Sequence, residues 1–597
     1  MIRAFLLLAL PIALAAQDNP CNNTPAYSPC EMTFDLAAQD AAAHPHPYAD
    51  VDLKVEFRSP RNKTYELPGY WNGGNRMVVR FSPTEGGEWN YRVTANIPSL
   101  DAKEGTFTAA ASDAPGFVRI ANVHHFAYTE RNIPHLWMGA TELGFATLSD
   151  DDARAVADAR GAQKFNHLRF LVLEPGAYDN PDSPNLAYFQ RLDDRIRYLN
   201  QKGITADLIL AGGDRALTRT FETREQRARF VHFVVARYGG MNVTWQVVQY
   251  FEDYPDARAL MKEVGLTLKR LDGMQHPRTT GAHTTSAPLL DDGWENFASY
   301  GSPNDAVGSI EHQLYAVPFV NLEPGREDTG AGKAEPGDGD AASFRHHLWN
   351  ATMDGQYVTY GNTGGGMKYL ETPGAKAMTV WWNLISTTRH WELEPYFDVD
   401  GGRAVALEGV EYIVYMEKPG PIELTVEKHS YDAIWIDPSD GATVRRKINS
   451  EHFVSEPPDK YHDWVLHVVR EGTVAGMNKS YYFESRDIEM QEVELNPEKV
   501  PFDVVKPDGP ISISKPSPYE ARLKAEKRAL RSVMWMWTGE VSQDAQGYRV
   551  LATGQQGTFT APARLATNYP ATMLLRVYAM NSYGKVYMVS KGYDLTP

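Results

Sequence analysis

Apolar and polar residues alternate along the first part of the chain. Residues 51–58, Val-Asp-Leu-Lys-Val-Glu-Phe-Arg, alternate without a break, and residues 89–93 do the same. A period of two is typical of a strand that buries one face. Asn-Gly-Gly-Asn at residues 72–75 supplies the residue types that tight turns between strands favour. The pattern therefore predicts a β-sandwich over residues 30–112.

After residue 116 the pattern changes, because short apolar runs now alternate with amphipathic helices. Residues 186–202 place four apolar side chains on one helical face, and Gly203 follows where a helix end favours glycine. Repeated strand–helix units over residues 116–393 predict a catalytic (β/α)8 TIM barrel. A doubly wound sheet, the alternative, favours a G-x-G-x-x-G turn that is missing after the first strand. The strand-like runs are residues 136–138, 167–173, 206–211, 243–248, 318–321 and 357–360.

The period of two returns in the last third of the chain. It predicts a second β-sandwich over residues 394–495. Six prolines then predict a stiff, non-helical linker over residues 496–518. Residues 519–597 contain further strand-like runs and are interpreted as an Ig-like or fibronectin-like β-domain. The predicted fold class is therefore multidomain, with a central (β/α)8 barrel between N-terminal and C-terminal β-sandwiches.

The first residues are typical of a signal peptide. Arg3 precedes an apolar run that ends in small residues and is too short to span a bilayer. We therefore expect residues 1–16 to be removed and the protein to be secreted or periplasmic. Export also favours a disulfide between the two cysteines, Cys21 and Cys30.

Net charge and composition narrow the choice of partner. A net charge of −17 repels nucleic acid and anionic membranes, so neither is an expected partner. No second long apolar stretch follows the leader, so membrane insertion is not expected. Aromatic residues make up 11% of the chain, which leaves rings that can stack on sugars. The expected partner is a carbohydrate substrate.

Two glutamates stand where a barrel places its catalytic groups, after the carboxyl ends of strands. Glu252 follows the run 243–248 among aromatic residues, whose apolar surroundings can raise the pKa of a general acid. Glu323 ends the run 316–322, before a proline that stops the strand. Two such carboxylates across the barrel mouth could flank one glycosidic bond. The alternative interpretation makes each a surface carboxylate or a group at a helix end.

Histidines and other polar residues at predicted strand ends could bind sugar hydroxyls, although a structural role is the common alternative for a single histidine. There is no H-E-x-x-H, and the histidine spacings match no compact zinc motif, so we expect no metal and no cofactor. The expected substrate-binding residues are Glu142, Arg169, Trp245, Tyr250, His276, His283, His312, Asn321 and Tyr360.

Several motifs resemble those of secreted apiosidase-like (α/β)8 glycoside hydrolases. The likeness includes Gly-Tyr-Trp-Asn-Gly-Gly-Asn at residues 69–75, residues 80–89, Phe-Asn-His-Leu-Arg at residues 165–169, and the segments 242–252 and 318–323. It covers about residues 30–495. Many members carry an uncharacterised N-terminal β-sandwich and a C-terminal β-sandwich described as collagen-binding. The resemblance implies a glycosidase that works through paired carboxylates.

Two positions depart from the family pattern. An acidic residue usually falls five positions after the strand tryptophan, where this chain has Tyr250. The first barrel strand carries Ala140 where the pattern has Asp, and Glu142 follows it. The main hypothesis is a secreted glycoside hydrolase acting on a plant or microbial polysaccharide or oligosaccharide, with Glu252 as general acid/base and Glu323 as nucleophile or base. The alternative is a non-catalytic carbohydrate-binding or adhesion protein on a degenerate glycosidase barrel, and collagen binding is a third possibility.

Overall fold

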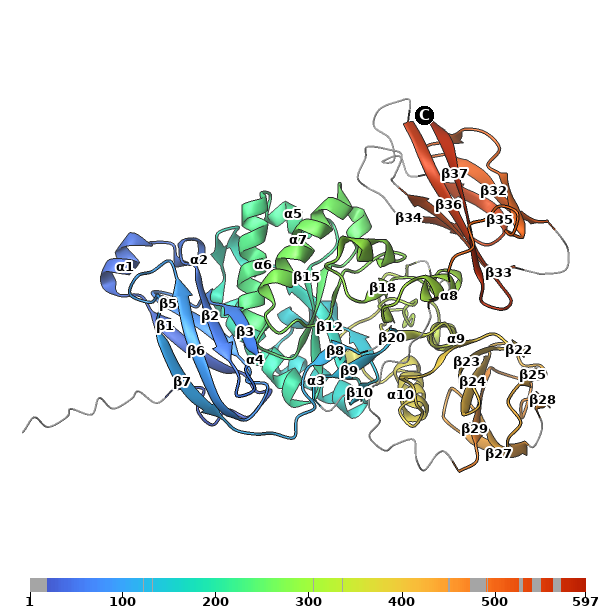
Figure 1. Ribbon diagram of the computed structural model, residues 1–597, viewed down its shortest axis with the longest axis horizontal. Helices are drawn as coiled ribbons and strands as arrows, with labels where there is room; N and C mark the ends of the chain where they lie inside the picture. The colour runs from blue at the N-terminus through green and yellow to red at the C-terminus, as the bar shows by residue number, and fades with distance from the viewer. Residues whose placement is uncertain are drawn as a thin grey trace, which may run out of the picture. The chain divides into compact units, whose positions relative to one another are not determined.

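The structure is a computed structural model, and its chain divides between residues 114 and 115 into two compact units (Figure 1). The predicted signal peptide, residues 1–16, lies outside the described residues. None of the helices in the described part of the chain is long and apolar enough to cross a membrane. The described residues are 19–121, 123–130, 133–303, 305–335, 337–448, 451–472, 490, 492–524, 530–538, 549–561 and 571–597.

The first unit packs two antiparallel sheets against each other, as the period of two predicts. Phe57 of one sheet stacks on Phe81 of the other, with ring centroids 4.0 Å apart, and Trp89 and Phe107 complete this aromatic core. Two short helices, α1 (Ala38–Ala43) and α2 (Pro47–Asp50), lie between strands. The sheets are β1 (Cys30–Asp35), β5 (Arg76–Phe81) and β4 (Tyr70–Trp71), and β3 (Thr64–Pro68), β2 (Leu53–Arg58), β6 (Gly87–Ala95) and β7 (Glu104–Ala109).

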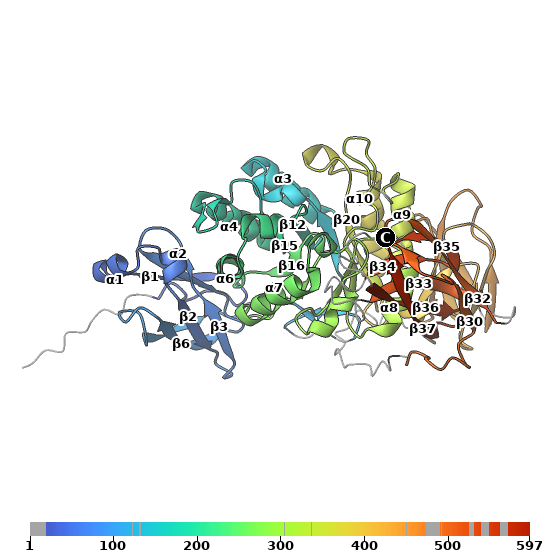
Figure 2. The ribbon, with the colours of Figure 1, turned by 90° about the horizontal axis from the view of Figure 1, so that it is seen from above.

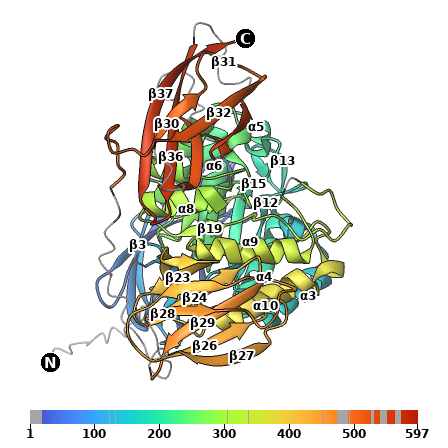
Figure 3. The same ribbon diagram turned by 90° about the vertical axis from the view of Figure 1, so that its right-hand side faces the viewer.

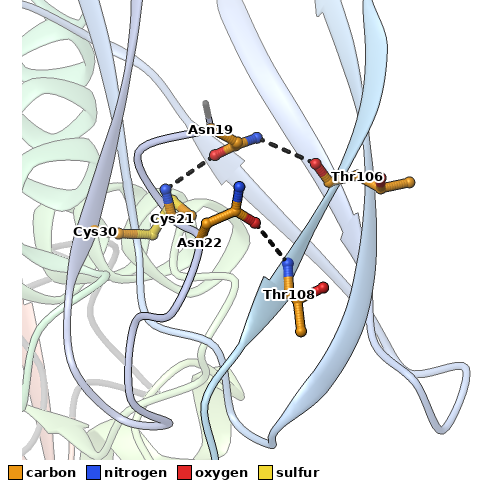
Figure 4. The surroundings of a disulfide bond; sticks show 6 residues. All are labelled: Asn19, Cys21, Asn22, Cys30, Thr106 and Thr108. Carbon is orange, nitrogen blue, oxygen red and sulfur yellow. Dashed lines mark hydrogen bonds between the residues drawn. A yellow bond between two sulfur atoms is a disulfide. The ribbon is translucent and has the colours of Figure 1, made fainter. Parts of the chain in front are cut away.

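The expected disulfide between Cys21 and Cys30 is present, which confirms that prediction (Figure 4). Asn22 accepts a hydrogen bond from the Thr108 N–H over 2.9 Å, and the Asn23 N–H donates to the Thr108 carbonyl over 2.8 Å. Thr108 lies on β7, the edge strand of its sheet. The disulfide-bonded segment therefore covers part of an edge that would otherwise offer unpaired backbone groups.

The second unit begins with the predicted barrel. Every pairing among its eight strands is parallel, and the order is β17-β16-β15-β12-β11-β20-β19-β18. Between β17 and β18 the Asn296 N–H donates to the Arg278 carbonyl over 3.1 Å, and the Arg278 N–H donates to the Asn296 side-chain oxygen over 2.8 Å. The strands are β11 (Met138–Thr141), β12 (His167–Leu173), β15 (Thr205–Ala211), β16 (Val243–Val248), β17 (Arg278–Thr279), β18 (Ala298–Tyr300), β19 (Phe319–Asn321) and β20 (Gln356–Tyr360).

Helices cover the outside of these strands, and Figure 2 shows α3, α4, α6 and α7 around β12, β15 and β16. Thr223 and Gln226 form a capping box at the start of α6. The short strands β8 (Val118–Ile120), β9 (Phe126–Tyr128) and β10 (Pro134–His135) precede the barrel, and β13 (Tyr178–Asn180) pairs with β14 (Ser183–Pro184). The helices are α3 (Asp150–Ala162), α4 (Leu186–Gln201), α5 (Ala216–Thr220), α6 (Arg224–Tyr238), α7 (Ala257–Leu271), α8 (Asp305–Leu314), α9 (Ala341–Met353) and α10 (Pro373–Ile385).

A second β-sandwich follows the barrel, and strands of its larger sheet run side by side in Figure 3. Its core contains Trp435, Trp464 and Tyr412, among other buried apolar residues. One sheet is β21 (Glu394–Tyr396), β23 (Arg403–Leu407), β24 (Glu411–Met416), β29 (Trp464–Arg470), β26 (Tyr431–Ile436) and β27 (Thr443–Ile448); the other is β22 (Val399–Asp400), β25 (Ile422–Thr425) and β28 (His452–Ser455).

The proline-rich stretch 496–518, predicted as a linker, is instead part of the last β-domain. Phe502 and Ile511 lie in that domain's core. Pro516 and Pro518 are tolerated in β32 because at those positions the strand pairs on one side, with β35. The strands are β30 (Phe502–Lys506), β31 (Ile511–Ser512), β32 (Pro516–Leu523), β33 (Leu530–Thr538), β34 (Arg549–Thr553), β35 (Gln556–Thr560), β36 (Ala571–Asn581) and β37 (Val586–Thr596).

Candidate active site

A series of hydrogen-bonded polar side chains lies inside the barrel and extends toward its carboxyl-terminal mouth. Asp207 of β15 accepts hydrogen bonds from Thr244 over 3.0 Å and from Gln246 over 2.6 Å. Gln246 in turn accepts one from the Arg169 Nε over 2.9 Å. Arg169 then reaches Glu323, its Nη1 2.7 Å from Oε1. Strands β12, β15 and β16 thus supply a buried support for Glu323.

Glu323 is the last residue of this hydrogen-bonded series, and its side chain is partly exposed to solvent. It lies two residues past β19, and 20% of its side chain is exposed while Arg169 is buried. The Tyr250 hydroxyl donates to its second oxygen, Oε2. Both carboxylate oxygens therefore accept hydrogen bonds from groups that the barrel holds in place.

Burial raises the pKa of both Asp207 and Tyr250. It raises the pKa of Asp207 from 3.8 to about 6, although the charge of Arg169 and the bonds from Thr244 and Gln246 act in the opposite direction. It also raises the pKa of Tyr250 above the ordinary value of 10.0, and the adjacent Glu323 carboxylate adds to the increase. Tyr250 therefore remains a protonated donor to Glu323 at neutral pH.

Two cavities meet at Tyr250 and Glu323. The larger, of about 820 Å³, is lined by Leu171, Glu174 and His283, among others. The smaller, of about 210 Å³, is lined by Glu142 and by loop residues after β20. Both cavities are bordered by Gln249, Tyr250, Glu323, Arg326 and Thr363. The mouth therefore combines acidic, basic and hydroxyl groups, which suits a ligand rich in hydroxyls.

The structure brings five of the predicted site residues together: Arg169, Tyr250, Glu323, His283 and Glu142. His283 stacks on Tyr250 with ring centroids 4.1 Å apart and planes inclined by 9°. Glu142 accepts a hydrogen bond from the Gly366 N–H over 2.8 Å, and burial raises its pKa above the ordinary value. A raised pKa favours the protonated form of a carboxyl group, which is the form that a general acid needs.

Glu252 takes a different role from the predicted one. Its carboxylate accepts hydrogen bonds from the His283 N–H, 3.0 Å away, and from the Thr284 N–H, 3.4 Å away. Asp253 bonds the His283 ring over 2.9 Å and so raises the pKa of that histidine. Among described residues, those lining the two cavities do not include Glu252. The side chain that reaches Glu323 from this strand end is Tyr250, and Glu252 instead fixes the backbone of the loop carrying His283.

Trp245 and His276, predicted to line the sugar site, lie elsewhere. Both contact Asp272, Trp245 through Nε1 over 3.0 Å and His276 through Nδ1 over 3.0 Å. Asp272 is the C-cap residue that follows α7 and precedes β17, so this cluster is at the amino-terminal end of the strands. The physical reason is strand alternation, since Thr244 and Gln246 face the barrel interior and Trp245 between them must face the helices.

The other three predicted residues also lie outside both cavities. His312 lies in the last turn of α8, before β19 begins, and bonds Glu394 over 2.7 Å. Asn321 donates to the Ser302 carbonyl over 2.8 Å. The Tyr360 hydroxyl donates to Glu327 over 2.6 Å. These residues are buried, so they brace loops and elements rather than contact a ligand at the mouth.

Sequence reasoning missed several residues of the site, among them Glu174, Asp207, Gln246 and Arg326. Asp207 and Gln246 occupy polar positions inside otherwise apolar strands, and this is a signal that the sequence does contain. Glu174 directly follows β12, and burial raises its pKa above the ordinary value. Arg326 is held by Asp338 over 2.8 Å, a pairing of two loop residues that no sequence pattern indicates.

Comparison with known proteins agrees with this architecture. Residues 121–394 match the family described as apiosidase-like, catalytic domain, and residues 23–96 match a domain of unknown function, DUF5060. No curated protein matches the chain at a significant level.

Solved structures resemble the chain in fold. A candidate glycoside hydrolase from Bacteroides vulgatus ATCC 8482 has a TM-score of 0.63 at 20% identity, over 75% of this chain and 100% of the other. A glycoside hydrolase family 5 protein from the same organism has a TM-score of 0.53 at 17% identity, over 62% of this chain and 95% of the other. A further glycoside hydrolase gives 0.53 at 17% identity, over 60% and 97%. At these identities the likeness concerns the fold.

Proposed function

We propose that this chain, whose barrel segment belongs to the apiosidase-like catalytic-domain family, is an exported glycoside hydrolase acting on a plant or microbial polysaccharide or oligosaccharide. The observation that carries the proposal is the position of Glu323. Its carboxylate stands where the two cavities meet, fixed on one oxygen by Arg169 and on the other by Tyr250. A carboxylate fixed in this way suits the nucleophile or base of glycoside hydrolysis.

The reaction also needs an acid that protonates the leaving oxygen. Glu142 fits this role better than Glu252, because it borders the same 210 Å³ cavity as Glu323. Burial raises the pKa of both glutamates, so position in the cavity is what separates them. Only one of its oxygens, Oε2, accepts the Gly366 N–H. Glu174 is the second candidate, since it borders the larger cavity and burial raises its pKa as well.

Release of reducing sugar from a panel of plant and microbial polysaccharides tests the proposal. Glu323→Gln keeps the shape of the side chain and removes its nucleophilic oxygen, so turnover should fall by about 10²–10⁴-fold or more. Glu225→Gln, an exposed change in the first turn of α6, is the matched control and should leave turnover unchanged. Unaltered turnover in Glu323→Gln would remove Glu323 from the mechanism.

Leaving-group dependence identifies the acid. The phenolate of an activated aryl glycoside can leave without being protonated. The alkoxide of an alkyl glycoside is a poor leaving group, so its departure needs proton transfer from the acid. If Glu142 is the acid, Glu142→Gln loses activity on alkyl glycosides and keeps most of it on activated aryl glycosides. The same pattern in Glu174→Gln, with Glu142→Gln fully active, would transfer the role to Glu174.

A second candidate function is carbohydrate binding without hydrolysis. Tyr250 supports it, because a hydroxyl occupies the strand end from which the family's usual acid would face Glu323. This function predicts that the unmutated chain binds an oligosaccharide by calorimetry and releases no product from it or from activated aryl glycosides. Product formation that Glu323→Gln abolishes would rule out this second function.

A further inference from the structure

Tyr250 and Glu323 border two cavities of very different volume. The larger cavity, of about 820 Å³, has about four times the volume of the smaller one, of about 210 Å³. A water molecule occupies about 30 Å³, so the smaller cavity has the volume of about seven waters, which is close to that of one sugar unit. If hydrolysis occurs at Glu323, one side of the cleaved bond therefore has room for a single sugar unit.

Two threonines that border the smaller cavity carry buried hydroxyl groups. Thr141 is the last residue of β11, and Thr359 lies on β20, the strand paired with it. Neither hydroxyl oxygen has a hydrogen-bond partner among the described residues. Leaving a buried hydroxyl without a partner costs free energy, so this cavity favours a ligand that brings hydroxyl groups of its own. A sugar ring is such a ligand.

A glycine-rich turn after β20 forms another wall of the smaller cavity and is fixed by hydrogen bonds. Asn362 Oδ1 accepts the N–H of Gly364 over 2.9 Å and that of Gly365 over 2.6 Å. The Gly366 N–H donates to Glu142 over 2.8 Å, which ties the turn to the segment after β11. A wall held at these points keeps the cavity at the size of one sugar unit.

The positions of the two carboxyl groups indicate which sugar occupies the smaller cavity, and this step rests on the proposed function with Glu142 as the acid. The sugar under attack lies next to both groups, because the nucleophile or base acts at its anomeric carbon and the acid protonates the oxygen bonded to that carbon. Glu323 borders both cavities, whereas Glu142, among the described lining residues, borders the smaller one alone. The attacked sugar therefore lies in the smaller cavity with no further unit beyond it, so it is a non-reducing end.

We propose that the protein is an exo-acting glycosidase, which binds the non-reducing terminal sugar of its substrate in the smaller cavity and releases it as a monosaccharide. In this reaction the bond between the anomeric carbon of the terminal sugar and the bridging oxygen breaks. Water supplies a hydroxyl group to the anomeric carbon, and the bridging oxygen leaves with a proton from the acid. The shortened glycan occupies the larger cavity before it dissociates.

The products formed from oligosaccharides with a fluorophore at the reducing end test the proposal. Exo action should shorten the labelled glycan by one sugar at a time and release monosaccharide alone, and an acetal on the non-reducing terminal sugar should block cleavage. Early labelled fragments that are several units shorter would show internal cleavage and overturn the exo action while leaving glycoside hydrolysis intact. No product from any polysaccharide, oligosaccharide or aryl glycoside would refute glycoside hydrolysis itself, and the exo action with it.

Variants of the two threonines then test which cavity holds the released sugar. Thr141→Val and Thr359→Val keep the branched shape and remove the hydroxyl group, so calorimetric affinity for the released monosaccharide should fall about 2- to 10-fold in each. Thr267→Val is the matched control, because the Thr267 hydroxyl bonds the Glu263 carbonyl on α7, outside both cavities. Unchanged affinity in both cavity variants, or an equal loss in Thr267→Val, would contradict the placement of the terminal sugar.

Discussion

Replacing Asp207 by asparagine should stabilise the barrel at neutral pH. The Asp207 side chain is buried inside the barrel, where burial raises its pKa from 3.8 to about 6. Because the folded-state pKa is the higher one, the folded chain binds the proton more tightly than the unfolded chain. Ionisation at neutral pH therefore destabilises the fold, and stability falls as pH rises from about 4 to about 6.

The magnitude follows from the size of the shift. A difference of about 2 pKa units corresponds to about 3 kcal/mol at pH 8. At pH 4 it corresponds to less than about 1 kcal/mol, because the folded state is almost fully protonated there and the unfolded state is still protonated to roughly two fifths. Asparagine has the same shape, its oxygen can accept from Gln246, and the Thr244 hydroxyl can turn to accept from its amide. In a domain of this size about 3 kcal/mol raises the melting temperature by roughly 6–12 °C.

Thermal unfolding of Asp207→Asn and the unmutated chain, recorded at pH 8 and pH 4, measures this effect. All other titrating groups are common to the two proteins, so their contributions cancel in the difference. The reasoning is refuted if the variant is less stable at pH 8, or if its gain is the same at both pH values. The second outcome would mean that the gain does not come from the charge of Asp207.

Three further predictions concern other contacts. Asp193 binds the buried Arg237 through two hydrogen bonds of 2.8 Å, so Asp193→Asn should cost about 3–5 kcal/mol in denaturant unfolding, and a loss below 1 kcal/mol would show that the pair is not needed. Tyr250→Phe removes a hydrogen bond to the charged Glu323 that is worth about 1.5–3 kcal/mol, so kcat should fall about 10- to 10²-fold while substrate binding changes less. An equal loss in calorimetric affinity would argue against a role of this hydrogen bond in turnover. Thr223→Ala removes the cap of α6 and should lower stability by about 1 kcal/mol in urea titration, which an unchanged midpoint would contradict.

The barrel could be predicted from the sequence because most of its strands are long enough to carry a pattern. The apolar run 167–173 coincides with β12, and the run 243–248 coincides with β16. Strands β17 and β18 have two and three residues and contain Arg278, Thr279 and Ser299, so no periodicity could reveal them. They are held by pairing with neighbouring strands, which is tertiary information.

The buried cluster around Glu394 could not be predicted from the sequence, for a related reason. The adjacent residues His124 and His125, His312 in the last turn of α8, and Glu394 on β21 come from distant parts of the chain. Single histidines at such spacings carry no sequence signal, and only the fold brings them to one point.

The assignment of Glu252 illustrates how far strand alternation alone could have gone. Thr244 and Gln246 face the barrel interior, and continuing the period of two places Tyr250 on the same face, where it contacts Glu323. The period stops there, because residues 251–253 form a turn of 3-10 helix. Glu252 therefore cannot be placed by parity, and its carboxylate caps loop N–H groups instead. The role of an acid facing Glu323 must be sought at another strand end, and this argument, independent of any pKa, also leads to Glu142 after β11.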